Sequence, residues 1–159
     1  MTRWGVGPAI TKYFATLTIV GIGARIALPE TFAFACLTDT SRLIAGASLF
    51  VLGVALYLWA LACVHPAFTA GELCTRGAYG VCRHPVYGSW ALLITPGLAL
   101  LVNSWLLMAA VAPMYVLLRL YVVREERWLE ERFGEAFCAY RRRVPAVLPV
   151  GWISRLFIR

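Results

Sequence analysis

The sequence is poor in charge and contains almost no lysine. Charged residues make up 14% of its 159 residues, and Lys12 is the only lysine. An ordinary soluble domain carries about 25% charge. Hydrophobic residues make up 61%, and the mean hydropathy is +0.74. A chain of this size cannot hide that much apolar surface from water, which excludes a soluble globular domain. The composition also excludes disorder and predicts an integral membrane protein, organised as one domain over residues 1–159.

Common signatures of binding chemistry are missing as well. The cysteines include no Cys-x-x-Cys pair, and at least three of the five lie in or beside apolar runs: Cys36, Cys63, Cys74, Cys82 and Cys138. We interpret them as small hydrophobic residues rather than as disulfides or metal ligands. No Gly-x-Gly-x-x-Gly follows a strand, so the nucleotide-binding design of soluble enzymes is absent. The sequence contains no internal repeat and no low-complexity segment.

Four apolar runs approach the length of about 20 residues that a membrane-spanning helix needs. They cover residues 13–28, 43–64, 86–102 and 105–123. Only Asn103 and Ser104 separate the last two runs, which predicts a tight helical hairpin. Pro96 and Pro113 lie inside this pair, and membrane helices tolerate proline when neighbouring groups bond the freed carbonyls. The sequence therefore predicts an all-α fold with four spans.

The first run could be mistaken for a signal peptide, since Arg3 and Lys12 precede it. However, Arg25 and Pro29 follow it without a small-residue cleavage pattern, and more spans come later. We expect the run to be kept as the first helix.

Basic residues are distributed unevenly between the two sides of these spans. The loop between the first and second runs contains Arg42, beside the acidic Glu30 and Asp39. The other side carries Arg3, Lys12, Arg76, Arg83, Arg124, Arg127, Arg132, Arg141, Arg142, Arg143, Arg155 and Arg159. Arginine and lysine gather on the cytoplasmic side of membrane proteins. This bias accounts for the net charge of +7 without nucleic acid and places both termini in the cytoplasm.

Two segments on the cytoplasmic side depart from the transmembrane pattern. Residues 65–85 contain glycines and His-Pro steps typical of a loop, and His65-Pro66 is expected to end the second span. Residues 124–140 have helical periodicity and predict a C-terminal amphipathic helix that ends at Val144-Pro145. One face of that helix carries Leu129, Phe133, Phe137 and Tyr140, with Glu126 in its middle. A carboxylate on an apolar stripe needs a partner.

Each polar cluster on this side also has a purely structural interpretation. Arg83 could anchor to lipid headgroups, with Pro85 starting a helix. Glu125 and Glu126 could complement the dipole of a helix N-terminus. The run Arg141–Arg143 is interpreted as a patch facing anionic headgroups. The functional interpretation gains weight because histidine, tyrosine, arginine and paired glutamates occur on one membrane face.

Five elements between Leu73 and Pro149, about half of the chain, follow a family pattern in order and spacing. They are Leu73-x-Thr75-x-Gly77-x-Tyr79, Arg83-His84-Pro85-x-Tyr87, Glu125-Glu126-x-x-Leu129, Phe133-Gly134 with Tyr140, and Val144-Pro145 with Pro149. In these elements the chain resembles the integral-membrane methyltransferases that include isoprenylcysteine carboxyl methyltransferases and phospholipid N-methyltransferases. The departures are Ala78 in place of proline, Phe137 in place of tyrosine, and Gly88 one position early. The chain is similar to a minimal prokaryotic member, expected in the bacterial inner membrane.

The resemblance implies S-adenosylmethionine as cofactor, bound at the cytoplasmic rim. The expected cofactor-binding residues are Leu73, Cys74, Tyr79, Arg83, His84, Pro85, Tyr87, Glu125 and Glu126. Their chemistry suits this molecule, because aromatic rings stabilise a sulfonium cation by about 0.5–2 kcal/mol. Its amine and ribose hydroxyls bind carboxylates, and its carboxylate binds arginine, histidine or exposed amides.

The acceptor is expected to be an amphiphilic, lipid-like molecule that enters from the membrane. In the family an arginine just upstream of the glutamate pair is thought to hold it, and both Arg119 and Arg124 fit that description. The expected catalytic residues are therefore Arg119, Arg124 and Glu126. A carboxylate acceptor needs a positioning cation but no base, whereas a phospholipid amine needs a base such as Glu126 or His84.

Three functions follow from these observations. Carboxyl O-methylation of an isoprenylcysteine-like compound comes first, because Arg119 is a cation inside an apolar run that contains no acid. N-methylation of a phospholipid amine such as phosphatidylethanolamine comes second. A reductase-like or purely interacting membrane protein stays open as a third function, because the same membrane core occurs in sterol-reductase relatives.

Overall fold

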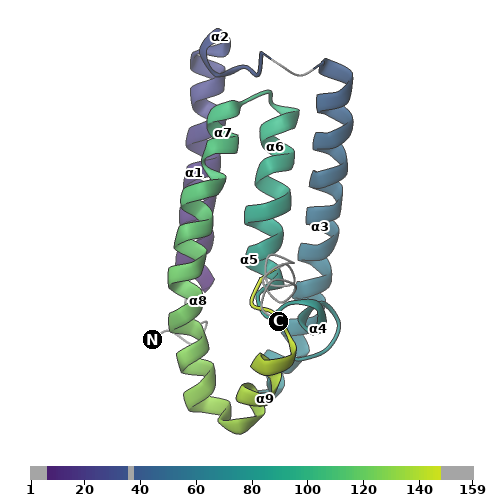
Figure 1. Ribbon diagram of the computed structural model, residues 1–159, viewed down its shortest axis with the longest axis vertical. Coiled ribbons are helices and arrows are strands. Elements are labelled where there is room, and N and C mark those ends of the chain that lie inside the picture. The colour runs from purple at the N-terminus through teal and green to yellow at the C-terminus, as the bar shows by residue number, and fades with distance from the viewer. Residues whose placement is uncertain (1–6, 36–37, 148–159) are drawn as a thin grey trace, which may run out of the picture.

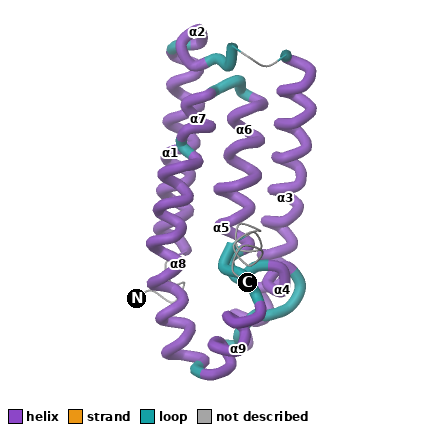
Figure 2. Tube along the Cα trace, viewed as in Figure 1, coloured by secondary structure: helices purple, strands orange, loops and turns teal. Residues whose placement is uncertain are grey.

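The computed structural model describes residues 7–35 and 38–147, and all regular structure in this part is helical (Figures 1 and 2). The elements are α1 (Gly7–Ala27), α2 (Pro29–Phe32), α3 (Asp39–Ala70), α4 (Ala78–Val81), α5 (Pro85–Ser89), the π-helix η1 (Trp90–Ile94), α6 (Thr95–Leu101), α7 (Trp105–Ala109), α8 (Val111–Phe133) and α9 (Glu135–Arg143). Predictions about Arg3, Cys36, Pro149, Arg155 and Arg159 lie outside the described residues.

The described helices confirm an all-α membrane protein. Three stretches are long and apolar enough to cross a membrane, namely Ile10–Ala27, Asp39–Ala70 and Trp105–Phe133. Pro85–Leu101 is apolar but shorter, so the count of four spans stays a prediction. In Figure 1 the long helices run side by side, with α2 and the α6–α7 turn at one end. The helices α4 and α9 and the end of α8 lie at the other end.

The third apolar run changes its helical geometry around Pro96. The backbone N–H of Thr95 bonds the carbonyl of Trp90, five residues back, which makes Trp90–Ile94 a π-helix. A proline cannot donate to the carbonyl four residues before it, and its ring clashes with that carbonyl. Widening the preceding turn accommodates the ring, so α5, η1 and α6 continue as one stretch.

The hairpin between α6 and α7 is tight, as predicted. Asn103 takes a positive φ of 57°, and the Ser104 hydroxyl caps α7 by accepting the backbone N–H of Leu107 at 3.2 Å. The backbone carbonyl of Asn103 accepts a hydrogen bond from Nε of Arg25 at 2.9 Å. Its side-chain Oδ1 accepts a hydrogen bond from the backbone N–H of Phe34 at 3.0 Å. The turn is therefore fastened to the end of α1 and to the segment after α2.

The prediction that His65-Pro66 ends the second span was wrong. Helix α3 continues through Pro66 to Ala70. It ends at Gly71, whose φ of 71° allows its N–H and that of Glu72 to bond the carbonyls of Phe68 and Ala67. One lost hydrogen bond at a proline is tolerated inside a long helix, whereas a left-handed glycine turns the chain away.

The predicted single helix over residues 124–140 is instead divided in two. Helix α8 runs without a break from the apolar run to Phe133, and Gly134, with φ 54°, separates it from α9. Phe137 and Tyr140 are buried on α9, whereas Leu129 and Phe133 on α8 are only partly buried. The glycine redirects the chain, so α9 turns back beside α4 (Figure 1), and the Tyr140 hydroxyl bonds the carbonyl of Tyr79 in the loop that follows α3.

A core beneath this loop joins three helices. It contains Ile10 and Phe14 of α1, Tyr87 and Ala91 of the α5–η1 stretch, Met114, Leu118 and Val122 of α8, and Val147. Helix α3 approaches the same stretch closely because Gly97 carries no side chain. A Cβ at Gly97 would lie 2.6 Å from the backbone nitrogen of Phe50. This packing fixes the end of α8 beside the start of α5.

Candidate active site

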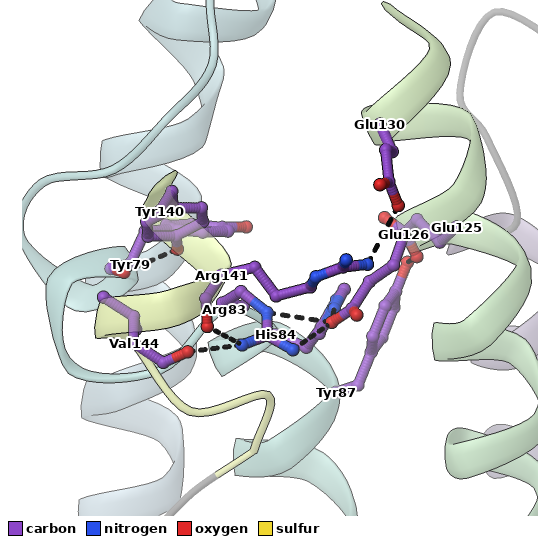
Figure 3. Close-up of polar contacts among 10 residues, drawn as sticks. All are labelled: Tyr79, Arg83, His84, Tyr87, Glu125, Glu126, Glu130, Tyr140, Arg141 and Val144. Carbon is purple, nitrogen blue, oxygen red and sulfur yellow. Dashed lines mark hydrogen bonds and ion pairs between the residues drawn. The ribbon is translucent and has the colours of Figure 1, made fainter. Parts of the chain in front are cut away.

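The loop before α5 meets two consecutive segments from much later in the chain, and together they form a cluster of polar contacts (Figure 3). They are the loop and short helix between α3 and α5, the end of α8, and the chain from α9 to Ala146. Each brings polar side chains that the sequence singled out. The geometry of their contacts shows which of these side chains act together.

Glu126 forms the centre of the cluster. Its Oε1 accepts hydrogen bonds from Nη2 and Nε of Arg83 at 2.6 and 2.8 Å. Nε2 of His84 lies 3.1 Å from the same oxygen. The side chains of Arg83, His84 and Glu126 are 10%, 3% and 13% exposed. This nearly buried cluster supplies the partner that a carboxylate on an apolar stripe requires.

Arg83 also fastens the chain that follows α9. Its Nη1 donates to the backbone carbonyl of Arg141 at 3.1 Å and to that of Val144. The backbone N–H of Arg83 bonds the carbonyl of Pro145 at 2.8 Å, and that of His84 bonds Ala146 at 3.0 Å. The contacts of the Arg83 side chain with Glu126, Arg141 and Val144 occupy four of its five guanidinium N–H groups. Arg83 therefore acts as a clamp among three segments.

Glu125 is in a different environment from its neighbour. Its Oε2 accepts the hydroxyl of Tyr87 at 3.0 Å, and no cation pairs with it in the described part of the chain. The Tyr87 ring stacks on that of His84 with centroids 6.0 Å apart and planes at 14°. The two adjacent carboxylates thus differ, because Glu126 is paired with Arg83 whereas Glu125 has a tyrosine hydroxyl as its described partner.

Tyr79 and Tyr140 form the opposite side of the site. The hydroxyl of Tyr140 donates to the backbone carbonyl of Tyr79 at 2.6 Å, although the residues are 61 positions apart. Burial is the main cause that raises the pKa of each hydroxyl well above its ordinary value. Both tyrosines therefore remain neutral at physiological pH, with an aromatic face and a polar hydroxyl.

The start of the loop is shaped by contact with α3. Leu73 and Cys74 are both partly buried, and the Cys74 thiol donates weakly to the backbone carbonyl of Cys63 at 3.4 Å. A Cβ at Gly77 would lie 2.5 Å from Sγ of Cys63, and its φ is +60°. Only glycine fits this position. No disulfide joins the cysteines at positions 63, 74, 82 and 138 of the described chain.

Pro85 begins α5 as its first residue and is fully buried. Its fixed φ suits the first turn of a helix. The helix start therefore places His84 as its N-cap and Tyr87 within its first turn, beside the two glutamates. Pro85 thus starts a helix as the structural interpretation predicted, whereas Arg83 pairs with Glu126 instead of reaching out to headgroups. The functional interpretation stays a prediction.

Arg119 and Arg124 lie outside this cluster. Both are exposed on α8, and neither has a hydrogen-bond or ion-pair partner among the described residues. Seven residues are about two full helical turns, so Arg119 lies on the same side of α8 as Glu126, about 10 Å deeper along the helix. Arg124, two residues from Glu126, projects about 160° away from it. Only Arg119 therefore shares a helix face with the cluster.

Some contacts were missed by reasoning from sequence. The patch predicted at Arg141–Arg143 is partly paired, since Arg141 contacts Glu130 at 2.9 Å and Arg142 contacts Glu135 at 2.7 Å. The carbonyls of residues 141 and 144–146 accept the hydrogen bonds of Arg83 and of the backbone N–H of His84. No pattern of side chains predicts a backbone acceptor. The hydroxyl of Tyr140 could have been found, because Tyr140 belongs to the pattern that continues past the glutamate pair.

Comparison with known proteins identifies the family of this chain. A family model described as phospholipid methyltransferase matches residues 41–136, which include nearly all of α3, the loop with its Arg-His-Pro sequence, and the glutamate pair. The chain belongs to the phospholipid methyltransferase family. This confirms the resemblance seen in the sequence.

Two curated relatives match part of this phospholipid methyltransferase family chain. The cobalt-zinc-cadmium resistance protein CzcN of Cupriavidus metallidurans is 40% identical over 78 residues, which are 48% of this chain and 35% of the relative. The nickel-cobalt-cadmium resistance protein NccN of Alcaligenes xylosoxydans xylosoxydans is 38% identical over 78 residues, 49% of this chain and 36% of the relative. The match thus spans about a third of each relative. No solved structure matches significantly.

Proposed function

We propose that this protein transfers a methyl group from S-adenosylmethionine to an amphiphilic, lipid-like acceptor at the cytoplasmic face of the bacterial inner membrane. The observation that carries the proposal is the pair of adjacent carboxylates in different states. Glu126 is paired with Arg83 in a nearly buried cluster, and Glu125 accepts a hydrogen bond from the hydroxyl of Tyr87. Family membership supports the same chemistry.

The residues present fit S-adenosylmethionine. This cofactor supplies an electrophilic methyl group on a sulfonium cation, next to a cationic amine. Glu125 offers a carboxylate without a cation, and Tyr87 and Tyr79 offer aromatic faces near it. Carboxylates and aromatic rings both stabilise cations. The site thus has the charge and the aromatic lining that a sulfonium ligand requires.

We assign different roles to Glu125 and to Glu126 with its partners. Arg83 and His84 hold Glu126, so that they position α8 against the loop. Because most guanidinium N–H groups of Arg83 are occupied, few remain to bind a ligand. We therefore expect the backbone amides of the loop, which the sequence also suggested, to bind the carboxylate of the cofactor. Glu125 binds the amine or ribose. The expected contacts of Leu73, Cys74 and Pro85 are with the apolar parts of the cofactor.

Catalysis of methyl transfer depends on placement more than on acid–base chemistry. Bound S-adenosylmethionine would supply the methyl group, and Glu125 with the loop amides would hold it. A nucleophile held about 3–3.5 Å from its target carbon gains several kcal/mol from orientation alone. The protein contributes the supporting core, in which residues of α1, α5 and α8 pack together beside the Glu126 cluster.

We propose a carboxylate as the acceptor, in an isoprenylcysteine-like compound. The two groups that could serve as a base, His84 and Glu126, are bonded to each other, and Glu126 is also paired with Arg83. A carboxylate is already ionised at neutral pH and needs no base. Arg119, exposed on the Glu126 side of α8 and deeper in the membrane, can hold such an anion.

Phospholipid amine methylation is the second candidate, and the description of the matching family favours it. The experiment is to incubate protein in lipid nanodiscs with labelled S-adenosylmethionine and either N-acetyl-farnesylcysteine or phosphatidylethanolamine. A base-labile methyl ester on the farnesylcysteine supports our first choice. Methylated phosphatidylethanolamine without any ester replaces it with the second. Methylation of neither acceptor rejects both.

The distribution of arginines indicates on which side of the membrane the site lies. Arg76, Arg83, Arg124, Arg127, Arg132 and Arg141–Arg143 lie at the end of the helices that carries the candidate site. Because arginine-rich segments stay on the cytoplasmic side, we place the site there. A cysteine-accessibility assay with an impermeant reagent at a cysteine introduced at Arg143 tests this in intact cells. Labelling from outside the cell would reverse the orientation.

A further inference from the structure

The groups that we propose for the cofactor are covered in part by protein. Tyr87 is 9% exposed, and Glu125 and Tyr79 are partly buried. Beside them His84 is 4% exposed, and Ala78 and Cys82 are completely buried. A ligand that comes from the cytoplasm can reach them only if part of the rim moves. The question is which contact has to break for this to happen.

A side-chain hydrogen bond outside the Glu126 cluster joins helix α9 to the loop. The hydroxyl of Tyr140 donates to the carbonyl of Tyr79 at 2.6 Å. Tyr140 is 8% exposed, and its ring packs edge-on against Phe137, which is completely buried, with centroids 6.2 Å apart. The donor is therefore well positioned, and its bond is shielded from water.

On its other side α9 meets α8 through exposed contacts. It joins α8 through Gly134, at φ 54°, and a Cβ there would meet nothing within 4 Å. Arg141 and Glu130, the ion pair that spans the bend, are 42% and 40% exposed. Exposed ion pairs of this kind contribute little stability. The end of α9 is held by Arg83, which bonds the carbonyls of Arg141 and Val144. Release of the Tyr140 contact therefore frees the loop around Tyr79, while Arg83 keeps the end of α9 in place.

We infer that Tyr140 is a latch that fastens the loop around Tyr79 to α9 and controls exchange of the cofactor. The inference rests on the proposed function, since it concerns S-adenosylmethionine and its product S-adenosylhomocysteine. Tyr140 is a positioning residue: it holds the carbonyl of Tyr79, and with it the ring of Tyr79, against the site. Opening of the latch leaves the Arg83–Glu126 ion pair intact, because Tyr140 does not contact it.

The test compares Tyr140→Phe with Tyr121→Phe. Tyr121 lies on α8 beside Tyr13, and its hydroxyl has no hydrogen bond in the described structure. Both changes remove one hydroxyl and keep the ring. The first readout is the rate at which Cys82 reacts with a soluble maleimide, followed by mass spectrometry of its peptide. Cys82 is buried between the two tyrosines and affects the pKa of both, so it reports loop opening without any ligand.

A single neutral hydrogen bond corresponds to about a 2- to 10-fold change in an equilibrium. We expect Tyr140→Phe to raise the alkylation rate of Cys82 by about that factor, with Tyr121→Phe unchanged. The second readout is the exchange of bound S-adenosylhomocysteine. A latch predicts that its association and dissociation rates both rise, so that Kd changes less than either rate.

Several results would overturn the latch. Unchanged Cys82 labelling in Tyr140→Phe means that the hydroxyl does not hold the loop. Faster labelling with unchanged exchange rates means that the contact is structural only. If the wild-type protein binds neither S-adenosylmethionine nor S-adenosylhomocysteine, the proposed function fails and the role in cofactor exchange fails with it. The labelling readout still reports, in that case, whether Tyr140 fastens the loop.

Discussion

Nη2 of Arg83 lies 2.6 Å from Oε1 of Glu126, and this ion pair joins two parts of the chain that are 43 residues apart. The pair connects the loop after α3 to the end of α8. The same guanidinium bonds two carbonyls of the segment after α9. One side chain therefore fixes the relative positions of all three segments that form the site.

Replacing Arg83 should damage the fold as well as binding. Arg83→Gln leaves the Glu126 carboxylate nearly buried without its cation, which costs about 3–5 kcal/mol in comparable pairs. Arg83→Lys keeps the charge but cannot form the forked contact, so we expect an intermediate loss. Thermal unfolding in detergent measures both. An unchanged melting temperature in Arg83→Gln would show that the clamp does not stabilise the rim.

The two arginines proposed for the acceptor can be separated by substitution. Arg119→Gln should raise the KM for the lipid acceptor at least about tenfold, equivalent to about 1.4 kcal/mol. Arg124→Gln should leave KM unchanged, because Arg124 projects away from the Glu126 side of α8. Binding of S-adenosylmethionine should be the same in both variants. A larger effect of Arg124→Gln on KM would reverse the assignment.

Gly77 allows the loop to lie against α3, and its replacement should be costly. Gly77→Ala places a methyl group on Sγ of Cys63 and strains a backbone with φ +60°. Overpacking costs about 1–3 kcal/mol, and a positive φ adds about 1–2 kcal/mol. Combining it with Cys63→Ala should recover part of the loss of thermal stability, because only the overlap is removed. No recovery would indicate that backbone strain accounts for the whole effect.

The buried tyrosines predict how stability depends on alkaline pH. Burial raises the pKa of Tyr79 and Tyr140, so the folded protein keeps both protons where the unfolded chain begins to lose them, near pH 10. A raised pKa in the folded state contributes stability that is full below about pH 10 and declines above it. Melting temperatures between about pH 8 and pH 11 measure this decline. Tyr140→Phe should make it shallower, and an equally steep decline would contradict the burial of its hydroxyl.

The sequence predicted the chemistry of the site better than its geometry. The Arg-His-Pro sequence and the glutamate pair are visible as residue types, and an acid on an apolar stripe had to have a partner. That the partner is Arg83 was not predictable, because the contact depends on how α8 packs against α5. The backbone acceptors after α9 have no side-chain signal at all.

Errors in the fold came from competing backbone signals. Pro66 was interpreted as a helix end, but a long apolar helix absorbs one lost hydrogen bond, and Gly71 ends α3 instead. The stripe from Leu129 to Tyr140 has a continuous helical period, yet Gly134 breaks it because a positive φ there sends α9 toward the loop. Local periodicity does not reveal the tertiary contact, made by Tyr140, that accompanies such a bend.

Binding of S-adenosylmethionine is the most direct test of the account. Calorimetry on the detergent-purified protein should detect binding in the wild type. Glu125→Gln should weaken it at least about tenfold, because it removes the carboxylate that has no cation of its own. Glu131→Gln, at an exposed position of the same helix, is the matched control and should bind normally. Well-folded wild-type protein that binds no S-adenosylmethionine, or Glu125→Gln that binds as tightly as wild type, would contradict the proposed site.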